Sequence, residues 1–448
     1  MAPQVKTVVS ETRIKNPPEQ TPDDSLLSTS PSKIFLVSKL ATHNQCGVTI
    51  SEWKDRKLTD DVETLIHNEH VPVGELYWKA EHLKACLKKE YPDCKIWLVG
   101  SFAAGIALSS SDLDFSLEIP NMMGHESAKL EAIWNKLRDY YDHPYYDRVL
   151  FTKFPVLKMT LKYSDKRISD VDVDLTLDNH PPKRNTQLLV WYGQIDSRFP
   201  ALCRAVKIWA SRTGVKNSKN GSLNSFSVCI LVIFFLQQVK VLPNIQEVFE
   251  ELNGELEIQD DDYYKRDLLE ELHDKGIVVG QNGSSLGALF FGFMKFYSEL
   301  DFDNHWISIK RGKLLKKIDE DGNPVDGLPH NSQYIVLEDP FLEHPFNCAR
   351  TVKDLARFKK IQNEFQKGYD DIKNYHRIIC DQSPARVTIE KNGIEVDERI
   401  KDVDQFPVVN MNPYENWDKV IPGLKDPKRN FRIHPKMYYD LNFGNFGL

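Results

Sequence analysis

A change of hydrophobic period near residue 182 constrains the fold of this chain more than any other feature of its sequence. Before it, β-rich or alternating runs typical of half-buried strands lie at 95–99, 112–119, 156–163 and 168–177. Residues 59–91, and after Pro181 and Pro182 residues 188–192, 201–213 and 223–239, show helical spacing of apolar side chains. The sequence therefore predicts an α+β fold, in which helices precede a small mixed sheet and a mainly helical domain follows.

Length and composition allow two domains with tails. With 448 residues, 41% of them hydrophobic, the chain can bury two cores of ordinary size. Residues 1–45 are rich in Pro, Ser, Thr, Lys and Gln without periodic apolar content, so we expect a disordered N-terminal arm. We expect the sheet and its preceding helices over 46–182, the helical domain over 183–384 and a C-terminal extension over 385–448.

Cysteine usage and charge exclude several classes of protein. Seven cysteines, scattered and never spaced as CxxC, argue against a disulfide framework and a zinc site and indicate a reducing compartment. The start lacks a secretory signal pattern, and no apolar run reaches the roughly 18 residues of a membrane span. We expect a cytoplasmic protein without a membrane partner, although a nuclear location is equally compatible with these signals. The net charge of −7 argues against strong non-selective binding of nucleic acid.

Acidic residues on the predicted strands form a candidate metal site. Asp112 and Asp114 stand at i and i+2, which places both carboxylates on one face with Cα atoms about 7 Å apart. This pair can bridge divalent cations, or it can simply face solvent. Gly100 and Ser101 follow a strand and precede a short helix, where amides and a hydroxyl can hold a phosphate. A third carboxylate lies at Asp172 or at Asp174 on a later strand, and spacing alone does not choose between them.

The segments LVGS at 98–101 and SDLD at 111–114 resemble the hG[GS] and DhD signature of the DNA polymerase β superfamily. Further segments follow in the order found in the noncanonical poly(A) and poly(U) polymerases: DLTLDN at 174–179, NT at 185–186, VKIWA at 206–210, GSLNSF at 221–226, LGALFFGF at 286–293, WISI at 306–309 and LEDPF at 337–341. The resemblance covers about residues 58–384. It implies a polymerase β-like nucleotidyltransferase domain followed by a helical PAP-associated domain.

The resemblance also implies an activity. It assigns Asp112, Asp114 and Asp174 as catalytic ligands of two Mg²⁺ or Mn²⁺ ions, and it selects Asp174 over Asp172. One ion lowers the pKa of an RNA 3′-hydroxyl while the other gathers the triphosphate. The implied reaction adds ribonucleotides from NTP to the 3′ end of single-stranded RNA without a template and releases pyrophosphate.

Several further residues match nucleotide-contacting positions of the family: Gly100, Ser101, Asn185, Thr186, Lys207, Ser225, Phe226 and Asp339. Lys207 lies opposite the apolar stripe of its helix, so we expect it to leave the core and meet a phosphate. The family carries a second basic residue one turn later, where this chain has Ser211 with Arg212 beside it. Asn185 and Ser225 can instead be a helix cap or a buried hydrogen-bonding partner. Phe226 retains a stacking face where relatives often carry Tyr.

Base choice rests on the segment after LEDPF. Family members that favour UTP carry a His just before an Asn, whereas here Phe346 precedes Asn347 and His344 is displaced. His344 is a candidate contact for the base edge, and the alternative is a residue of a surface loop. This difference favours uridylyl or mixed U and G addition, with UTP, and also GTP or ATP, as substrates, and it suggests a resemblance to the poly(UG) polymerases of nematode RNA silencing. The alternatives are a poly(A)-type adenylyltransferase, a catalytically weak scaffold and a second-messenger synthase. No RRM, KH or zinc-finger pattern is present, so we expect a recruiting protein.

Overall fold

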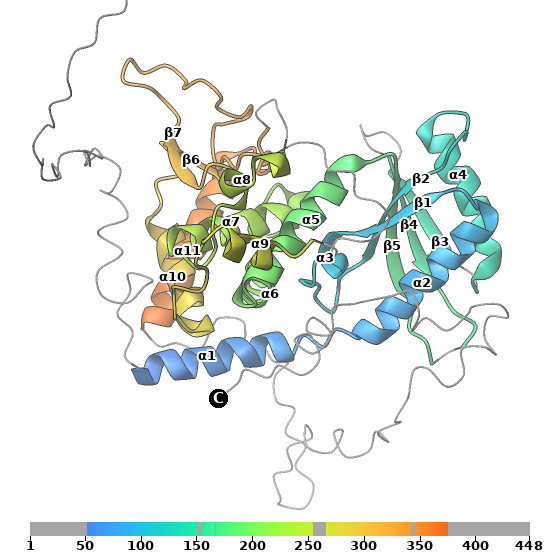
Figure 1. The fold of residues 1–448 in the computed structure, drawn as a ribbon, viewed down its shortest axis with the longest axis horizontal. Helices are drawn as coiled ribbons and strands as arrows, with labels where there is room; N and C mark the ends of the chain where they lie inside the picture. Colours follow the sequence, from blue (N-terminus) through green and yellow to red (C-terminus); the bar gives the residue numbers. More distant parts are fainter. Residues whose placement is uncertain are drawn as a thin grey trace, which may run out of the picture.

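The computed structural model describes residues 52–142, 144–149, 155–165, 167–253, 266–341 and 346–374 (Figure 1). The predicted N-terminal arm at 1–45, the C-terminal extension at 385–448 and His344 lie outside the described residues.

A five-stranded sheet forms the first part of the fold, in the order β1-β2-β5-β4-β3. Its strands are β1 Lys95–Val99, β2 Leu113–Glu118, β3 Tyr145–Val149, β4 Val156–Leu161 and β5 Val171–Leu177. β2 and β5 are parallel, and the other neighbouring pairs are antiparallel. The predicted small mixed sheet is confirmed. The sequence analysis did not predict β3, which forms the edge of the sheet and pairs only with β4 among the described strands.

Two helices pack against this sheet. α2 Val73–Glu90 and α4 Glu126–Leu137 bury leucines at helical spacing, and these join the strand residues in one apolar core. The one-turn helix α3 Gly100–Ala103 follows β1 directly. It ends early because the chain turns into the left-handed region at Gly105, with φ +71.

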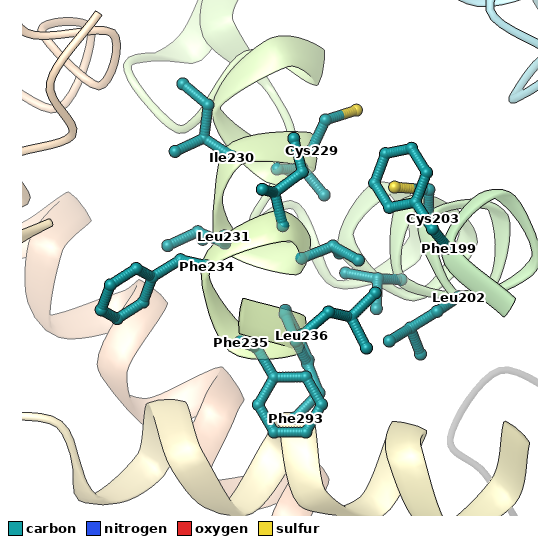
Figure 2. Packing of buried hydrophobic residues seen from close by; sticks show 14 of the residues in the cluster. Phe199, Leu202, Cys203, Cys229, Ile230, Leu231, Phe234, Phe235, Leu236 and Phe293 are labelled. Atoms are coloured by element: carbon teal, nitrogen blue, oxygen red, sulfur yellow. The ribbon is translucent and has the colours of Figure 1, made fainter. Parts of the chain in front are cut away.

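The second part of the fold is mainly helical. Its elements are α5 His180–Ile195, α6 Arg198–Thr213, α7 Ser225–Gln238, α8 Ile245–Val248, α9 Leu268–Asp274, α10 Leu286–Glu299, α11 Leu355–Lys373 and a hairpin of β6 His305–Ser308 and β7 Lys313–Lys316. α7 lies at the centre, and Figure 2 shows its Phe235 against Phe293 of α10. Residues Ser227 to Leu236 are all buried, and α7 lies within the stretch 223–239 for which helical spacing predicted a helix. No helix among the described residues is long and apolar enough to span a membrane.

Helix α1 Glu52–His67 packs on the helical part, although it precedes the sheet in sequence. The Gly287 amide of α10 donates to Thr59 Oγ1 at 3.1 Å. A Cβ atom at Gly287 would lie 2.5 Å from the Thr59 amide nitrogen, so the two helices approach closely only because residue 287 is glycine. The chain therefore passes from the helical part to the sheet and back again.

The two prolines near the expected domain boundary lie in the first turn of α5, where a missing amide hydrogen costs nothing. Directly after them, Lys183 donates to Glu118 Oε1 at 2.5 Å, and its Nζ lies 3.2 Å from the centre of the Trp97 ring. These contacts join α5 to β1 and β2. At the expected boundary, the first helix after the sheet therefore contacts two of the strands directly.

Candidate active site

A left-handed turn after β1 holds the first part of the site. Gly100 has φ +78, and a Cβ atom there would lie 2.1 Å from Asp114 Oδ2. The Gly100 amide donates to Thr186 Oγ1 at 2.9 Å, and the Ser101 hydroxyl donates to Ser111 Oγ at 3.2 Å. The polar groups expected to hold a phosphate therefore have partners within the protein. Gly100 itself leaves room for the Asp114 carboxylate.

Strand register brings two of the predicted carboxylates together. Asp114 on β2 lies opposite Asp174 on the parallel strand β5. Asp112 lies two residues before Asp114, where the chain enters β2. Asp172 is exposed and accepts a hydrogen bond from Thr160 Oγ1 at 2.7 Å. The fold thus groups Asp174, and not Asp172, with Asp114.

The carboxylates repel one another in a partly enclosed space. Burial raises the pKa of Asp114 to about 8, with further contributions from Asp112 and Asp174. Burial also raises the pKa of Asp174, although Lys158 opposes the rise. Lys158 lies opposite Asp174 in the β4–β5 register, and its Nζ contacts Asp174 Oδ2. Lys158 was not assigned to this site from the sequence, although the alternation of β4 places residues 156, 158 and 160 on one face.

The donor chemistry of this site fits divalent cations. Carboxylates are the ligands that Mg²⁺ and Mn²⁺ prefer. Burial and the neighbouring carboxylates raise the pKa of Asp114, while the ammonium groups of Lys158 and Lys207 oppose this rise. Within the described residues, no three His, Cys, Asp or Glu side chains are already grouped closely enough to hold one ion. The residues therefore fit a cation by charge and ligand type, while Asp174 shares its carboxylate with Lys158.

Helix α5 carries two of the predicted nucleotide contacts. Thr186 is buried, and its hydroxyl accepts from the Gly100 amide and donates to the Pro182 carbonyl at 2.7 Å. This hydroxyl positions the turn after β1, and its single proton is already donated to the Pro182 carbonyl. Asn185 is half-buried, and in the described ranges its side-chain amide makes no hydrogen bond.

The structure corrects the predicted orientation of Lys207. Its side chain is 2% exposed and donates from Nζ to the Ile106 carbonyl at 2.7 Å. Helical periodicity placed Lys207 off the apolar stripe, but the segment after α3 covers that side of α6. Burial lowers the pKa of Lys207, while the Asp114 carboxylate opposes the shift. Lys207 therefore holds the backbone of Ile106 from within the core, near the carboxylates.

The two residues expected to supply the second cation point to other groups. Ser211 is exposed, and its hydroxyl donates to the Lys207 carbonyl at 2.7 Å. Arg212 Nη2 lies 3.7 Å from Glu69 Oε1, after the end of α1. Glu69 also accepts from Ser109 Oγ at 2.6 Å.

The first turn of α7 presents two further predicted residues. Asn224 caps the helix by accepting from the Ser227 amide at 2.8 Å, so Ser225 is not needed as a cap. Ser225 is exposed at the first helical position. Phe226 is half-buried and packs its ring against the helical core. Both residues remain candidates for contact with a nucleotide.

Backbone hydrogen bonds shape the loop around Asp339. Its amide donates to the Phe346 carbonyl at 2.8 Å, and its Oδ1 accepts from the Phe341 amide at 3.0 Å. The guanidinium carbon of Arg184 lies 4.7 Å from the centre of the Phe341 ring. This contact, which the sequence analysis missed, links α5 to the loop. Asn347 is buried and accepts from the Leu337 amide at 3.0 Å, so it shapes the loop from inside.

Comparison with known proteins identifies the family. Residues 61–194 match the central palm domain of mitochondrial-like poly(A) RNA polymerases, and residues 285–345 match the Cid1 family of poly(A) polymerases. Human poly(A) RNA polymerase GLD2 is 27% identical over 367 residues, which cover 77% of this chain and 70% of GLD2. Human terminal uridylyltransferase 7 is 30% identical over 282 residues, which cover 61% of this chain but only 18% of that protein.

Both matched regions and the GLD2 relatives support a noncanonical poly(A)/poly(U) polymerase. The polymerase is therefore an RNA nucleotidyltransferase of the template-independent type, and the predicted enzyme class is confirmed. The chain matches about two thirds of the length of the GLD2 proteins, at 70% of the human and 66% of the bovine one.

Solved structures share the fold of the polymerase. The Cid1 poly(U) polymerase bound to MgGTP superimposes with a TM-score of 0.59 at 24% identity, over 71% of this chain and 95% of that one. GLD-2 in its complex with RNP-8 gives a TM-score of 0.59 at 23% identity, over 72% and 96% of the two chains. The predicted polymerase β-like fold is confirmed.

Proposed function

We propose that the polymerase adds ribonucleotides from NTP to the 3′-hydroxyl of single-stranded RNA at Asp112, Asp114 and Asp174. The observation that supports this most is the register of Asp114 with Asp174 beside the glycine turn at Gly100. Carboxylates on facing positions of neighbouring strands repel one another, and a bound cation would relieve this repulsion. Transfer of a nucleotidyl group needs such cations, because charge on the attacking and leaving oxygens must be neutralised.

Asp112, Asp114 and Asp174 would hold two Mg²⁺ or Mn²⁺ ions, which when bound acidify the 3′-hydroxyl and neutralise the triphosphate. The MgGTP in the Cid1 structure supports magnesium as one of the metals. Asp174 accepts the hydroxyl proton or orients the hydroxyl. Lys158 favours the ionised form of Asp174 through its ion pair. Gly100 keeps the space that the Asp114 carboxylate occupies.

Residues of the helical part would bind the nucleotide. Asn185 contacts the ribose, because its side-chain amide makes no hydrogen bond in the described part of the chain. Phe226 stacks on the base, Ser225 contacts a phosphate and Asp339 lies in the base-recognition loop. The hydrogen bonds described above hold the backbone around the site in place. They involve Gly100, Ser101, Thr186 and Lys207.

For the base, we favour uridylyl or mixed U and G addition. The Phe at position 226 and the displaced His344 support a relaxed choice of base. Adenylyl addition is the alternative, since the relatives include both the poly(A) polymerase GLD2 and terminal uridylyltransferases. A mixed U and G tail would suit a role in RNA silencing in the cytoplasm. The GLD-2/RNP-8 complex supports recruitment of the RNA by a partner protein.

The test is extension of a labelled single-stranded RNA with each NTP separately and with all four, in Mg²⁺ or Mn²⁺. We expect the wild type to lengthen the RNA and Asp112→Ala/Asp114→Ala to leave it unchanged. Asp172→Ala is the matched control, because this exposed residue lies on the strand of Asp174 and its carboxylate accepts a hydrogen bond from Thr160. Sequencing of the tails reads the base preference. Extension by the double variant would overturn the assignment, and a wild type that extends no RNA would favour a scaffold.

A further inference from the structure

The loop between α6 and α7 folds back onto the end of α6. Gly214 ends the helix with φ +76, and the Lys216 amide then donates to the Ala210 carbonyl at 2.7 Å. Lys216 also forms an isolated parallel bridge with Leu223, whose amide donates to the Val215 carbonyl at 3.0 Å. The backbone of Lys216 is therefore held beside the last turn of α6. That turn follows the turn that carries Lys207.

The Lys216 side chain is half-buried, yet no carboxylate or carbonyl of the described residues forms an ion pair or hydrogen bond with its ammonium. It lies within electrostatic reach of the Asp112 carboxylate and of the Lys207 ammonium. Burial lowers the pKa of Lys216, and Cys229 and Asp112 oppose that shift. A half-buried cation without a direct partner costs free energy, so an anionic ligand there is favourable.

The other cations near the carboxylates have partners. Lys207 donates to the Ile106 carbonyl, and Lys158 contacts Asp174. Arg212 faces Glu69, and the hydroxyl of Ser211 bonds within its own helix. Among these groups, Lys216 is left with an ammonium that can turn to a ligand without breaking a hydrogen bond.

We propose that Lys216 binds the triphosphate of the incoming nucleotide and supplies the cation that position 211 lacks. The inference rests on the proposed function and concerns the same site. A lysine suits this role because its ammonium is a compact charge on a flexible stem that can follow a phosphate oxygen. Within electrostatic reach of Asp112, it would offset charge on the phosphates that the catalytic carboxylates would otherwise repel.

The test is Lys216→Met, which keeps the stem and removes the charge. Equilibrium binding of a non-hydrolysable NTP analogue with Mg²⁺, and separately of single-stranded RNA, measures the two affinities without turnover. We expect the Kd for the analogue to rise about tenfold or more while the Kd for RNA stays within about twofold. Lys216→Arg should recover most of the affinity. Lys219→Met is the matched control, because Lys219 is exposed in the same loop, and it should change neither Kd.

A second variant separates a lost contact from a damaged loop. Ser211 is exposed and lies one turn beyond Lys207 on α6, so Ser211→Lys in the Lys216→Met background places a cation on the neighbouring face. We expect this variant to regain NTP affinity and to restore the KM for NTP without a change in kcat.

Weaker RNA binding with unchanged NTP binding would overturn the proposal and assign Lys216 to the RNA strand. Unchanged affinities for both ligands would overturn it as well. A wild type that binds the NTP analogue but extends no RNA would refute the proposed function and leave the Lys216 site standing. A wild type that binds no NTP would refute both.

Discussion

The carboxylate end of the sheet and helix α7 are both largely enclosed. The buried side chains of the first are charged and repel one another, whereas those of the second are apolar and pack together. At the sheet end, Asp114 lies among like charges, and its pKa is raised to about 8. In α7, apolar side chains such as Phe234 and Leu236 are fully buried within the apolar core (Figure 2). The fold gains stability from α7 and retains repulsion at the sheet end. Substitutions in the two regions should therefore have opposite effects on stability and on activity.

The largest effect should come from Asp114→Asn, which removes a charge and keeps the shape. We expect extension activity to fall by at least about a thousandfold, because the site loses a cation ligand. The free energy of unfolding without metal should stay level or rise by about 1 kcal/mol, because repulsion is relieved. Single-turnover extension and urea unfolding measure the two quantities. A clear loss of stability would contradict the comparison, and Asp172→Asn controls for a generic loss of acid.

Phe234→Ala should show the reverse pattern. The ring is fully buried and lies 6.1 Å from the ring of Phe296, centre to centre, so its loss leaves a cavity. We expect the free energy of unfolding to fall by about 3–5 kcal/mol, with activity per folded molecule unchanged at low temperature. Met123→Ala removes a side chain that is 90% exposed and should leave stability unaltered. Equal losses in the two variants would refute a stabilising role for α7.

Gly100→Ala should damage both properties, because this residue touches the carboxylate and bends the backbone. A Cβ atom would displace the Asp114 carboxylate, so we expect activity to fall about a hundredfold. The positive φ should cost about 1–3 kcal/mol of stability. Gly280→Ala is the matched control, since Gly280 has φ +73 with no atom within 4 Å of the added Cβ. If both variants lose the same activity, backbone strain is the cause and not the contact with Asp114.

The smallest effect concerns a buried charge away from the site. Burial lowers the pKa of Lys317 to about 8, although its Nζ donates to the Tyr334 carbonyl at 2.5 Å. Between this pKa and the normal lysine value the unfolded chain binds the extra proton, so the contribution of Lys317 to stability rises with pH.

Lys317→Met removes this dependence. From pH 7.5 to 9.5, the unfolding free energy of the wild type should rise by about 1 kcal/mol relative to that of the variant. Urea unfolding at several pH values measures it. Lys313→Met in the neighbouring strand is the control, since Lys313 is exposed. A constant difference would mean that Lys317 stays charged in the fold.

Local patterns predicted those elements whose burial is decided by their own residues. The run at 95–99 became β1, because its last four side chains form a continuous apolar run and all four are buried. β3 was not predicted, since an edge strand depends on its neighbour β4 more than on its own pattern. The prediction that the Lys207 side chain leaves the core was wrong, because another segment covers the polar side of its helix. Asp172 and Asp174 were equivalent by spacing, and only strand pairing distinguishes them.

The packing of α1 has a consequence for how the chain is made. The apolar face of α1, with Leu58, Val62 and Leu65, closes against α10, and the hydrogen bond between Thr59 and Gly287 spans 228 residues. A ribosome therefore releases α1 long before its partner exists, while the sheet that follows can pair its strands early. We expect the helical core to fold last, with α1 docking on it at the end. Fragments that stop short of α10 should expose the apolar face of α1, which favours aggregation and binding by chaperones.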